Sequence, residues 1–328
     1  MPKIYVYICL THWLGFFNEK IYRRKDMKKR LLAIITSFVL LFAVGCSSNK
    51  EVTVTDREGN EVTIPSKLEK IITTAPSNTE ILVGLGVADK LVAVDTYSEG
   101  IEGLNEDIPK MDMNNPDAEA IIALEPDIII ASGYNKIGSA EDPYKAIVEA
   151  GIPVVYIPSS DSIEGIYKDI EFVASLVNEN KKGEEIITDM KEKISKYEEL
   201  AKTITDKKKV YFEIGAAPNL FSFGSSTFLN EMIEVIGAEN VFADEESWFA
   251  PTEEAILDAN PDVILTKVDY VENATEEIMA RDGWDNITAV KNGDVYYIDA
   301  NSAARGNQNI IKALDEMAKA VYPDVYGK

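Results

Sequence analysis

The sequence predicts an α/β protein made of two Rossmann-like lobes that a single long backbone helix joins. Two observations predict this class. Apolar strand-like runs alternate with helical patterns on both sides of a helical stretch from Ser162 to Ile204, and the two sides repeat one another. Such alternation implies largely parallel sheets, because parallel strands need a crossover helix between them. A chain of 328 residues is long enough for two lobes with their own cores.

The segment before the lobes has the order of an export signal. A basic stretch, Met27 to Arg30, precedes a 15-residue apolar run, Leu31 to Gly45, and Cys46 follows directly. The sequence Ala-Val-Gly-Cys at residues 43–46 resembles a lipobox, at which the signal is cut and the cysteine acylated. The alternative is an ordinary membrane anchor helix, but a bilayer span needs roughly 20 residues. We therefore expect residues 27–45 to be a signal peptide and Cys46 to carry a lipid on the extracytoplasmic face of the cell membrane.

Residues 1–26 are not expected to be part of the translated protein. The run MPKIYVYICLTHWLGFF has neither a helical nor a strand period, and an export signal begins at its basic end. We expect translation to start at Met27. The mature chain would then lack Cys9 and His12, so that Cys46 is its one cysteine and no internal disulfide can form.

The charge balance is strongly acidic. The net charge is -23, and removal of residues 1–45 leaves 25 Lys and Arg against 54 Asp and Glu. Nucleic-acid binding needs a basic patch to displace counterions from phosphates, so that class is excluded. Most of the negative charge is explained by solubility, because molecules of like charge repel one another.

The N-terminal lobe is expected over residues 51–165, after a tether at 46–50. Val52 and Val54 alternate with polar residues before the turn REGN, and Val62 and Ile64 do so after it, which predicts a β-hairpin. The strands and helices that follow are, in order, KIITTA, a helix from Thr79, KLVAVD, a helix from Asp117, DIIIAS, a helix near Tyr144 and PVVYIP.

Linking helices are expected over residues 166–206, within the helical stretch and in two pieces broken near residues 178–180. The second piece places its apolar residues on one stripe at spacings of three and four: Ile186, Met190, Ile194, Tyr197, Ala201 and Ile204. The C-terminal lobe then takes residues 207–328, with KVYFEIG, helices from Thr227 and Thr252, DVILTK, a helix around Glu276, DVYYID and a last helix from Asn309 to Val321.

The two lobes contain an internal repeat. Residues 116–130 (PDAEAIIALEPDIII) are identical to residues 251–265 (PTEEAILDANPDVIL) at seven of fifteen positions. Glu80 precedes Gly86 by six residues, as Glu231 precedes Gly237, so the two glutamates are at equivalent helical positions. VVYIP and VYYID form a third pair. Chance similarity can produce one such pair, but the shared order of three argues against it.

Three segments of the chain carry a family resemblance. They are VTVTDREGNEVTIPSKLEKIITTAPSNTEILVGLGVADKLVAV, ALEPDIIIAS and VYYIDANSAARGNQNIIKALDEMAKAVYP. They resemble the substrate-binding proteins of ABC importers for chelated iron (siderophores) and cobalamin, over roughly residues 52–323.

The resemblance implies a ligand cleft between the lobes, little hinge closure, and as partners a permease with its cytoplasmic ATPase. It also implies that one glutamate on each lobe docks on permease arginines, and the matching positions are Glu80 and Glu231. A planar guanidinium suits carboxylates, and two charges on a rigid body fix an orientation. The alternative for Glu80 is an acidic residue that complements the dipole of its own helix. We expect a monomer.

The cleft residues are predicted from the rule that ligands lie beyond the carboxyl ends of strands in α/β sheets. The resemblance adds Asn301 and Arg305, from NSAAR, although Gly306-Asn307-Gln308 departs from the proline-containing stretch that relatives commonly have. For Arg305 the alternative is a helix-entry or surface charge. The predicted ligand contacts are Tyr97, Met113, Tyr134, Trp248, Tyr270, Asn301 and Arg305.

The composition of these segments favours a large, flat, mostly uncharged ligand. Only Arg57, Arg281 and Arg305 remain after Cys46, whereas catecholate siderophores need clusters of arginine. We therefore favour a corrinoid such as cobalamin over a ferric siderophore. Haem held through a tyrosine is a further alternative.

Other classes fit less well. The mature chain has no histidine for Ser-His or Cys-His catalysis or for a bare zinc or manganese site, so we expect no enzyme, no cofactor and no directly bound metal. A carboxylate-dependent hydrolase or a surface adhesin remains as an alternative.

Overall fold

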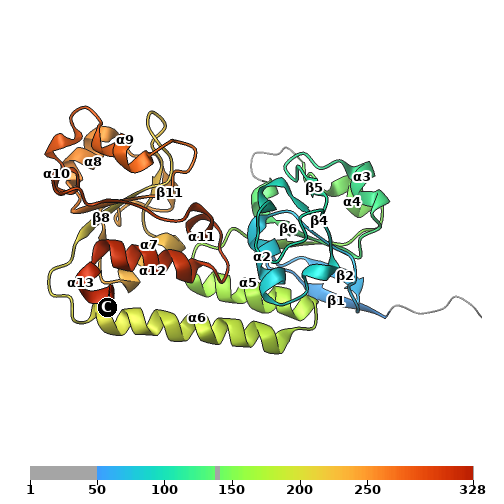
Figure 1. The fold of residues 1–328 in the computed structure, drawn as a ribbon. Coiled ribbons are helices and arrows are strands. Elements are labelled where there is room, and N and C mark those ends of the chain that lie inside the picture. The colour runs from blue at the N-terminus through green and yellow to red at the C-terminus, as the bar shows by residue number, and fades with distance from the viewer. Residues whose placement is uncertain (1–49, 137–140, 328) are drawn as a thin grey trace, which may run out of the picture. The chain divides into compact units, whose positions relative to one another are not determined.

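The computed structural model describes residues 50–136 and 141–327, and the residues from Glu51 onward form one compact unit (Figure 1). The predicted signal peptide, Cys46 and residues 1–26 lie outside the described residues. No helix in the described ranges is long and apolar enough to cross a membrane.

The N-terminal lobe begins with the predicted hairpin, β1 (Glu51–Thr55) and β2 (Glu61–Pro65), in which Val52 pairs with Ile64 and Val54 with Val62. The hairpin tip is fixed to the lobe. The N–H of Arg57 donates to the carbonyl of Tyr156, 3.1 Å, and the N–H of Tyr156 donates to the Asp56 carboxylate, 2.9 Å. The hairpin is therefore docked on the lobe as well as closed on itself.

The first sheet of the described chain is parallel throughout, in the order β5-β4-β3-β6-β7. Its strands are β3 (Ile71–Thr73), β4 (Leu91–Asp95), β5 (Lys110–Met111), β6 (Ile128–Ser132) and β7 (Val154–Ile157). The chain runs from β3 outward to β5 on one side and returns to β6 on the other. The switch point thus lies between β3 and β6. The connections that follow these two strands run in opposite directions, which leaves a crevice between them.

Different helices cover the two faces of this sheet. Ile72 and Ile129 point to a core with Ile121 and Ile147, from α3 (Ala118–Ala123) and α4 (Lys145–Glu149). Ile71 points to the opposite core, which includes α2 (Pro76–Gly84). The helix predicted from Thr79 begins at Pro76, because proline at the first helical position needs no hydrogen-bond acceptor for a backbone N–H.

Two helices link the lobes, α5 (Ile163–Leu176) and α6 (Asn180–Ala201), and they are broken where the sequence predicts. Asn178, at the break, has a left-handed φ of 61°. The apolar stripe of α6 buries Met190 and Ile194 in a core that is continuous through both lobes. Figure 1 shows α6 running beneath both lobes.

The second sheet, over the described residues, is also parallel, in the order β10-β8-β12-β13. Its strands are β8 (Lys209–Glu213), β10 (Glu239–Asn240), β12 (Val263–Thr266) and β13 (Val295–Tyr297), beside an antiparallel pair of β9 (Ser222–Phe223) and β11 (Trp248–Phe249). The helices are α7 (Phe228–Val235), α8 (Glu253–Ala259), α9 (Ala274–Met279), α10 (Thr288–Asn292), α11 (Ala300–Ala304), α12 (Ile310–Val321) and α13 (Pro323–Tyr326). Short 3-10 turns occur at Ala88–Lys90, Thr96–Ser98, Gly133–Lys136 and Trp284–Asn286.

The topology of the two sheets supports the sequence repeat. In the first lobe β3 pairs with β6, which follows α3, and β7 lies beyond β6. In the second lobe β8 pairs with β12, which follows α8, and β13 lies beyond β12. The face of the second sheet away from the linking helices is covered by α8, α9 and α10, as α3 and α4 cover the first. The α/β class with parallel sheets is therefore confirmed. The antiparallel pair and the short helices α10, α11 and α13 were not predicted, because two to five residues carry no readable period.

Candidate functional site

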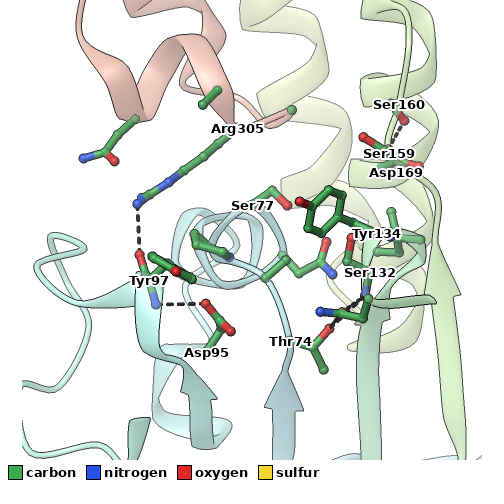
Figure 2. Close-up of a pocket in the computed structure, with 18 of the residues that line it drawn as sticks. Thr74, Ser77, Asp95, Tyr97, Ser132, Tyr134, Ser159, Ser160, Asp169 and Arg305 are labelled. Carbon is green, nitrogen blue, oxygen red and sulfur yellow. Dashed lines mark hydrogen bonds between the residues drawn. The ribbon is translucent and has the colours of Figure 1, made fainter. Parts of the chain in front are cut away.

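A cavity of about 590 Å³ lies between the lobes at the carboxyl ends of both sheets (Figure 2). Residues from both lobes line it. The N-terminal lobe and α5 contribute Thr74, Ala75, Pro76, Ser77, Asn78, Asp95, Tyr97, Asn114, Ser132, Tyr134, Asn135, Ile157, Pro158, Ser159, Ser160 and Asp169. The C-terminal lobe contributes Phe228, Trp248, Lys267, Asp269, Ala300, Asn301, Ala304, Arg305 and Gly306. We call this cavity the cleft.

The floor of the cleft at the first switch point is a closed polar network. The hydroxyl of Thr74, just after β3, donates to the side-chain oxygen of Asn135, 2.6 Å, and accepts from the N–H of Ser132, 2.8 Å. Asn135 also donates to the side chain of Asn114, 3.0 Å. Because these polar groups satisfy one another, they are held in place before any ligand arrives.

Two tyrosines project from this floor. Tyr97 is 70% exposed and Tyr134 is 61% exposed, and each follows a strand end through a short turn. The N–H of Tyr97 donates to the buried carboxylate of Asp95, 2.8 Å, and the N–H of Tyr134 donates to the Ser132 hydroxyl, 3.2 Å. Burial raises the pKa of Asp95 above its ordinary value. Both rings therefore stand on fixed backbone with their faces open to a ligand.

A buried ion pair supports the α5 side of the cleft. Asp169 is 2% exposed and accepts a hydrogen bond from Arg57 of the hairpin tip, 2.7 Å, and another from the Ser160 hydroxyl. Burial raises the pKa of Asp169, and both hydrogen bonds oppose the rise. Sequence reasoning assigned Arg57 only to the hairpin and missed Asp169, because Asp169 lies inside a helix and not at a strand end.

The opposite wall presents Trp248 and α11. Trp248 is 38% exposed, and the centroid of its ring lies 5.7 Å from that of Phe223 and 6.5 Å from that of Phe228. Asn301 lies in the first turn of α11, whose N-cap Asp299 accepts from the N–H of Ser302, 2.9 Å. Trp248 and Asn301 thus belong to the wall of the cleft that the C-terminal lobe contributes.

Arg305 follows α11 and reaches across to the N-terminal lobe. Its Nη1 donates to Glu80 Oε1, 2.5 Å. Its Nη2 donates to the carbonyl oxygen of Tyr97, 3.0 Å, as Figure 2 shows. Arg305 therefore lines the cleft as predicted, but its charge is compensated by Glu80.

The environment of Glu80 contradicts the predicted docking role. Glu80 is only 7% exposed, and besides Arg305 its carboxylate accepts hydrogen bonds from the side-chain amides of Asn307 and Asn309. The side chain of Gln308 donates to the Glu80 carbonyl, 2.7 Å. A carboxylate engaged in this way presents no charge to a partner at the surface. Asn307 and Gln308 thus enclose Glu80 together with Arg305 and Asn309.

Glu231 is likewise turned toward the linking helices. Its carboxylate accepts from the N–H of Ile163, 2.6 Å, which is the first residue of α5 and lacks an acceptor within the helix. Glu231 is half-buried, and this burial raises its pKa. The carboxylates at the two equivalent positions of the repeat are thus engaged in contacts to α5 and to the other lobe.

Two predicted ligand contacts lie outside the cleft. The side chain of Met113 is fully buried against α3 and α4, and its carbonyl accepts from the Tyr144 hydroxyl, 2.7 Å. Its neighbour Asn114 lines the cleft instead, in a turn in which the N–H of Asn114 donates to the Asp112 carboxylate, 3.0 Å. Tyr270 is exposed, but its hydroxyl accepts from the N–H of Ala216, 2.9 Å, and it does not line the cleft. Tyr97, Tyr134, Trp248, Asn301 and Arg305 do line it.

Among residues 50–136 and 141–327, no group of three or more His, Cys, Asp or Glu side chains could hold a metal ion. The cleft lining instead offers rings, amides and hydroxyls. Such a surface can contact a large organic ligand through stacking and hydrogen bonds.

Comparison with known proteins agrees with this architecture. The family model described as periplasmic binding protein matches residues 71–302. A Bacillus subtilis protein named as an uncharacterized ABC transporter substrate-binding lipoprotein, YvrC, is 36% identical over 280 residues, covering 84% of this chain and 87% of its own. The vitamin B12-binding protein of Vibrio parahaemolyticus is 24% identical over 258 residues, covering 77% and 89%. A crystal structure from Staphylococcus epidermidis, described as a possible iron-binding (periplasmic solute-binding) protein, aligns with a TM-score of 0.70 at 29% identity, covering 78% of this chain and 99% of the other.

Proposed function

This chain belongs to the periplasmic binding protein family, and from that premise we propose that it is the substrate-binding lipoprotein of an ABC importer, which captures a metal chelate and delivers it to the permease. The observation that carries the proposal is the cleft. It lies at the carboxyl ends of two parallel sheets, is lined from both lobes, and has the volume of a small-molecule site. A carrier needs such a site and no catalytic group.

The charges around the cleft favour a weakly charged chelate. Arg305 is paired with Glu80, and Arg57 is paired with Asp169. Neither arginine is available to bind the several negative charges of a ferric catecholate. A corrinoid or an uncharged ferric siderophore needs no cluster of arginines and can bind in a cleft lined by rings and amides. The vitamin B12-binding relative supports the corrinoid.

Haem is the second candidate, and one observation favours it. The exposed rings of Tyr97 and Tyr134 carry phenol oxygens on the cleft surface, and a phenolate is one of the side chains that bind haem iron. The arrangement can therefore take a flat porphyrin between its aromatic side chains.

The lipid anchor belongs to the same proposal. Cys46 would be diacylated after cleavage of residues 27–45, which holds a protein to the membrane more firmly than one acyl chain does. The Bacillus subtilis relative is named a lipoprotein, which supports this location on the extracytoplasmic face. The tether then ends where β1 begins, at Glu51.

We assign permease docking to Glu119 and Glu254 in place of Glu80 and Glu231. The longest pair of repeated segments aligns these two glutamates as an identical position. Both are exposed, both lie in the first turns of equivalent helices, α3 and α8, and these helices cover the sheet faces that point away from the linking helices. One accessible carboxylate on each lobe, at a fixed separation, is the arrangement that arginine-based docking requires.

The proposal is tested by ligand binding. Mature protein purified from rich medium is examined for a bound chromophore by visible absorption, and then titrated calorimetrically with cyanocobalamin, ferrichrome, ferric enterobactin and haemin. We expect saturation by cyanocobalamin and little heat with ferric enterobactin. Tight binding of ferric enterobactin alone would overturn the assignment of a weakly charged chelate. Turnover of a glycoside probe would favour a hydrolase, and failure to co-purify with a permease and ATPase would favour an adhesin.

A further inference from the structure

Lys267 lies in the wall of the cleft that the C-terminal lobe contributes. It directly follows β12, which adjoins β8 at the switch point of the second sheet, and its N–H donates to the carbonyl of Glu213, 3.2 Å. Its side chain lines the cleft and is half-buried. The backbone anchor fixes the base of the side chain at the position where ligands of parallel sheets bind.

The ammonium of Lys267 has no partner in the described chain. Two cations line the cleft there, and the other, Arg305, is held by Glu80 and by the carbonyl of Tyr97. Arg57, behind the wall, is held by Asp169. By contrast, Lys267 forms no ion pair and no side-chain hydrogen bond with any described residue, and burial lowers its pKa, opposed only by the charge of Asp269.

The ammonium of Lys267 is half-buried and has no acceptor among the described residues, so a ligand oxygen can pair with it. Withdrawing a charge from water costs free energy unless an acceptor replaces the lost hydration. Asp269 is two residues away but is exposed and does not pair with Lys267, and Asp95 lies on the other lobe. The protein therefore leaves Lys267 without an ion-pair partner in a cleft where the other cation, Arg305, is paired with Glu80.

We propose that Lys267 determines specificity by binding one anionic oxygen group, a carboxylate or a phosphate, at the edge of the chelate. The inference rests on the proposed chelate-binding function and narrows its ligand to one that is neutral over most of its surface and carries such a group. Because Asp95 and Asp269 also line the cleft, a second negative charge on the ligand would meet carboxylates rather than cations.

The test uses matched ligands that differ in the anionic group. The carboxylate arm compares N-succinyl ferrioxamine B with the neutral N-acetyl ferrioxamine B, and the phosphate arm compares cyanocobalamin, which has a phosphodiester, with dicyanocobinamide, which lacks it. Each is titrated calorimetrically into the wild type, Lys267→Gln, Lys267→Arg and the control Lys291→Gln, which changes an exposed lysine on α10.

We expect Lys267→Gln to weaken the anionic member of at least one pair by about 10- to 100-fold, as loss of a hydrogen bond to a charged group does. The neutral member should change by less than about twofold, Lys267→Arg should restore most of the loss, and Lys291→Gln should have no effect. The arm that responds identifies the carboxylate or the phosphate.

Two outcomes distinguish a failure of the role assigned to Lys267 from a failure of the proposed chelate-binding function. If the wild type binds one or more of these chelates and Lys267→Gln weakens the members of each pair equally or not at all, the role of Lys267 is overturned and the chelate-binding function stands. If the wild type binds none of them and none of the four chelates named in the preceding test, the proposed function is overturned and this inference with it. A thermal unfolding scan of each variant confirms that the titrated protein is folded.

Discussion

Arg305 and Glu80 form an ion pair between the two lobes, with Nη1 2.5 Å from Oε1, although the residues are 225 positions apart in the sequence. Glu80 also accepts from Asn309, 3.1 Å, so that one carboxylate of α2 joins the N-terminal lobe to the segment between α11 and α12. The pair holds the C-terminal lobe at the rim of the cleft, and it removes the charge of Arg305 from the ligand. Glu80 thus connects the two lobes of the protein.

Substitution of Glu80 should destabilise the protein. Glu80→Ala leaves the Arg305 guanidinium and two amides without their acceptor in a buried interface, and we expect a loss of about 3 kcal/mol in the free energy of unfolding. Urea denaturation measures it, with a double-mutant cycle to Arg305→Ala to isolate the pair. The control Glu119→Ala changes an exposed glutamate and should stay within about 0.5 kcal/mol of the wild type. Equal stability of the two variants would contradict the role of Glu80.

Charge reversal at the exposed glutamates of the repeat should separate transport from binding. We expect the double variant Glu119→Arg, Glu254→Arg to keep the ligand affinity and the thermal stability of the wild type and to abolish uptake in cells, because like charges then face the permease arginines. The matched control reverses two exposed glutamates on neighbouring helices, Glu149→Arg with Glu276→Arg, and should leave uptake unchanged. Normal uptake by the first double variant would refute the docking assignment.

Trp248 should contribute to ligand affinity and Tyr270 should not. Trp248→Ala removes a partly exposed ring from the cleft wall, and we expect calorimetric titration to show about tenfold weaker binding of the chelate. Tyr270→Ala removes a more exposed aromatic that lies outside the cleft, so the affinity of this variant should match that of the wild type. A larger loss for Tyr270→Ala than for Trp248→Ala would place the ligand elsewhere.

Stability should fall between mildly acidic and neutral pH. Burial raises the pKa of Glu231 above 4.5, so the folded protein keeps this proton at pH values where the unfolded chain has lost it. The folded state then binds more protons, and stability decreases as pH rises from the ordinary value through the raised pKa. Asp169 and Glu213 shift in the same direction through burial. Asp299 and Asp315 have lowered pKa values, so their contribution is lost only as pH falls below 3.8.

Glu231→Gln isolates one of these groups. The amide oxygen can still accept from the N–H of Ile163, but it does not titrate. We expect the melting temperature of this variant to fall less than that of the wild type as the pH rises above 4.5. Identical pH profiles of the two proteins would show that Glu231 is not responsible.

Cys46→Ser should abolish lipid attachment. Serine has no thiol to acylate, so we expect the full-length precursor carrying this change to incorporate no labelled palmitate, whereas the wild type incorporates it. Cys9→Ser is the matched control, because Cys9 lies before the predicted start at Met27. Incorporation of label by the Cys46→Ser variant would place the lipid on another residue or contradict the lipobox.

The positions of strands and linking helices could be read from the sequence because their apolar residues have regular periods. The break between α5 and α6 near Asn178 and the strands before Asp95, Ser132 and Lys267 follow from those periods alone. Five of the seven predicted ligand residues line the cleft. Tyr97 and Tyr134 do so because the carboxyl ends of parallel strands meet at one edge of a sheet, whereas Trp248 lies on the antiparallel strand β11. Met113 and Tyr270 were misplaced, because a strand-end rule locates a loop and does not say which way each side chain of it points.

The sequence by itself determined the class of the protein, its two repeated lobes and the edge at which the cleft lies, because local periodicity and chain order encode these. Only the tertiary structure decided which charges of the cleft remain available. Arg305 is neutralised by Glu80 and Asp169 by Arg57, each across more than a hundred residues, whereas Lys267 has no such partner in the described chain. Pairing of side chains depends on distance in space, which the spacing of residues along the chain does not give.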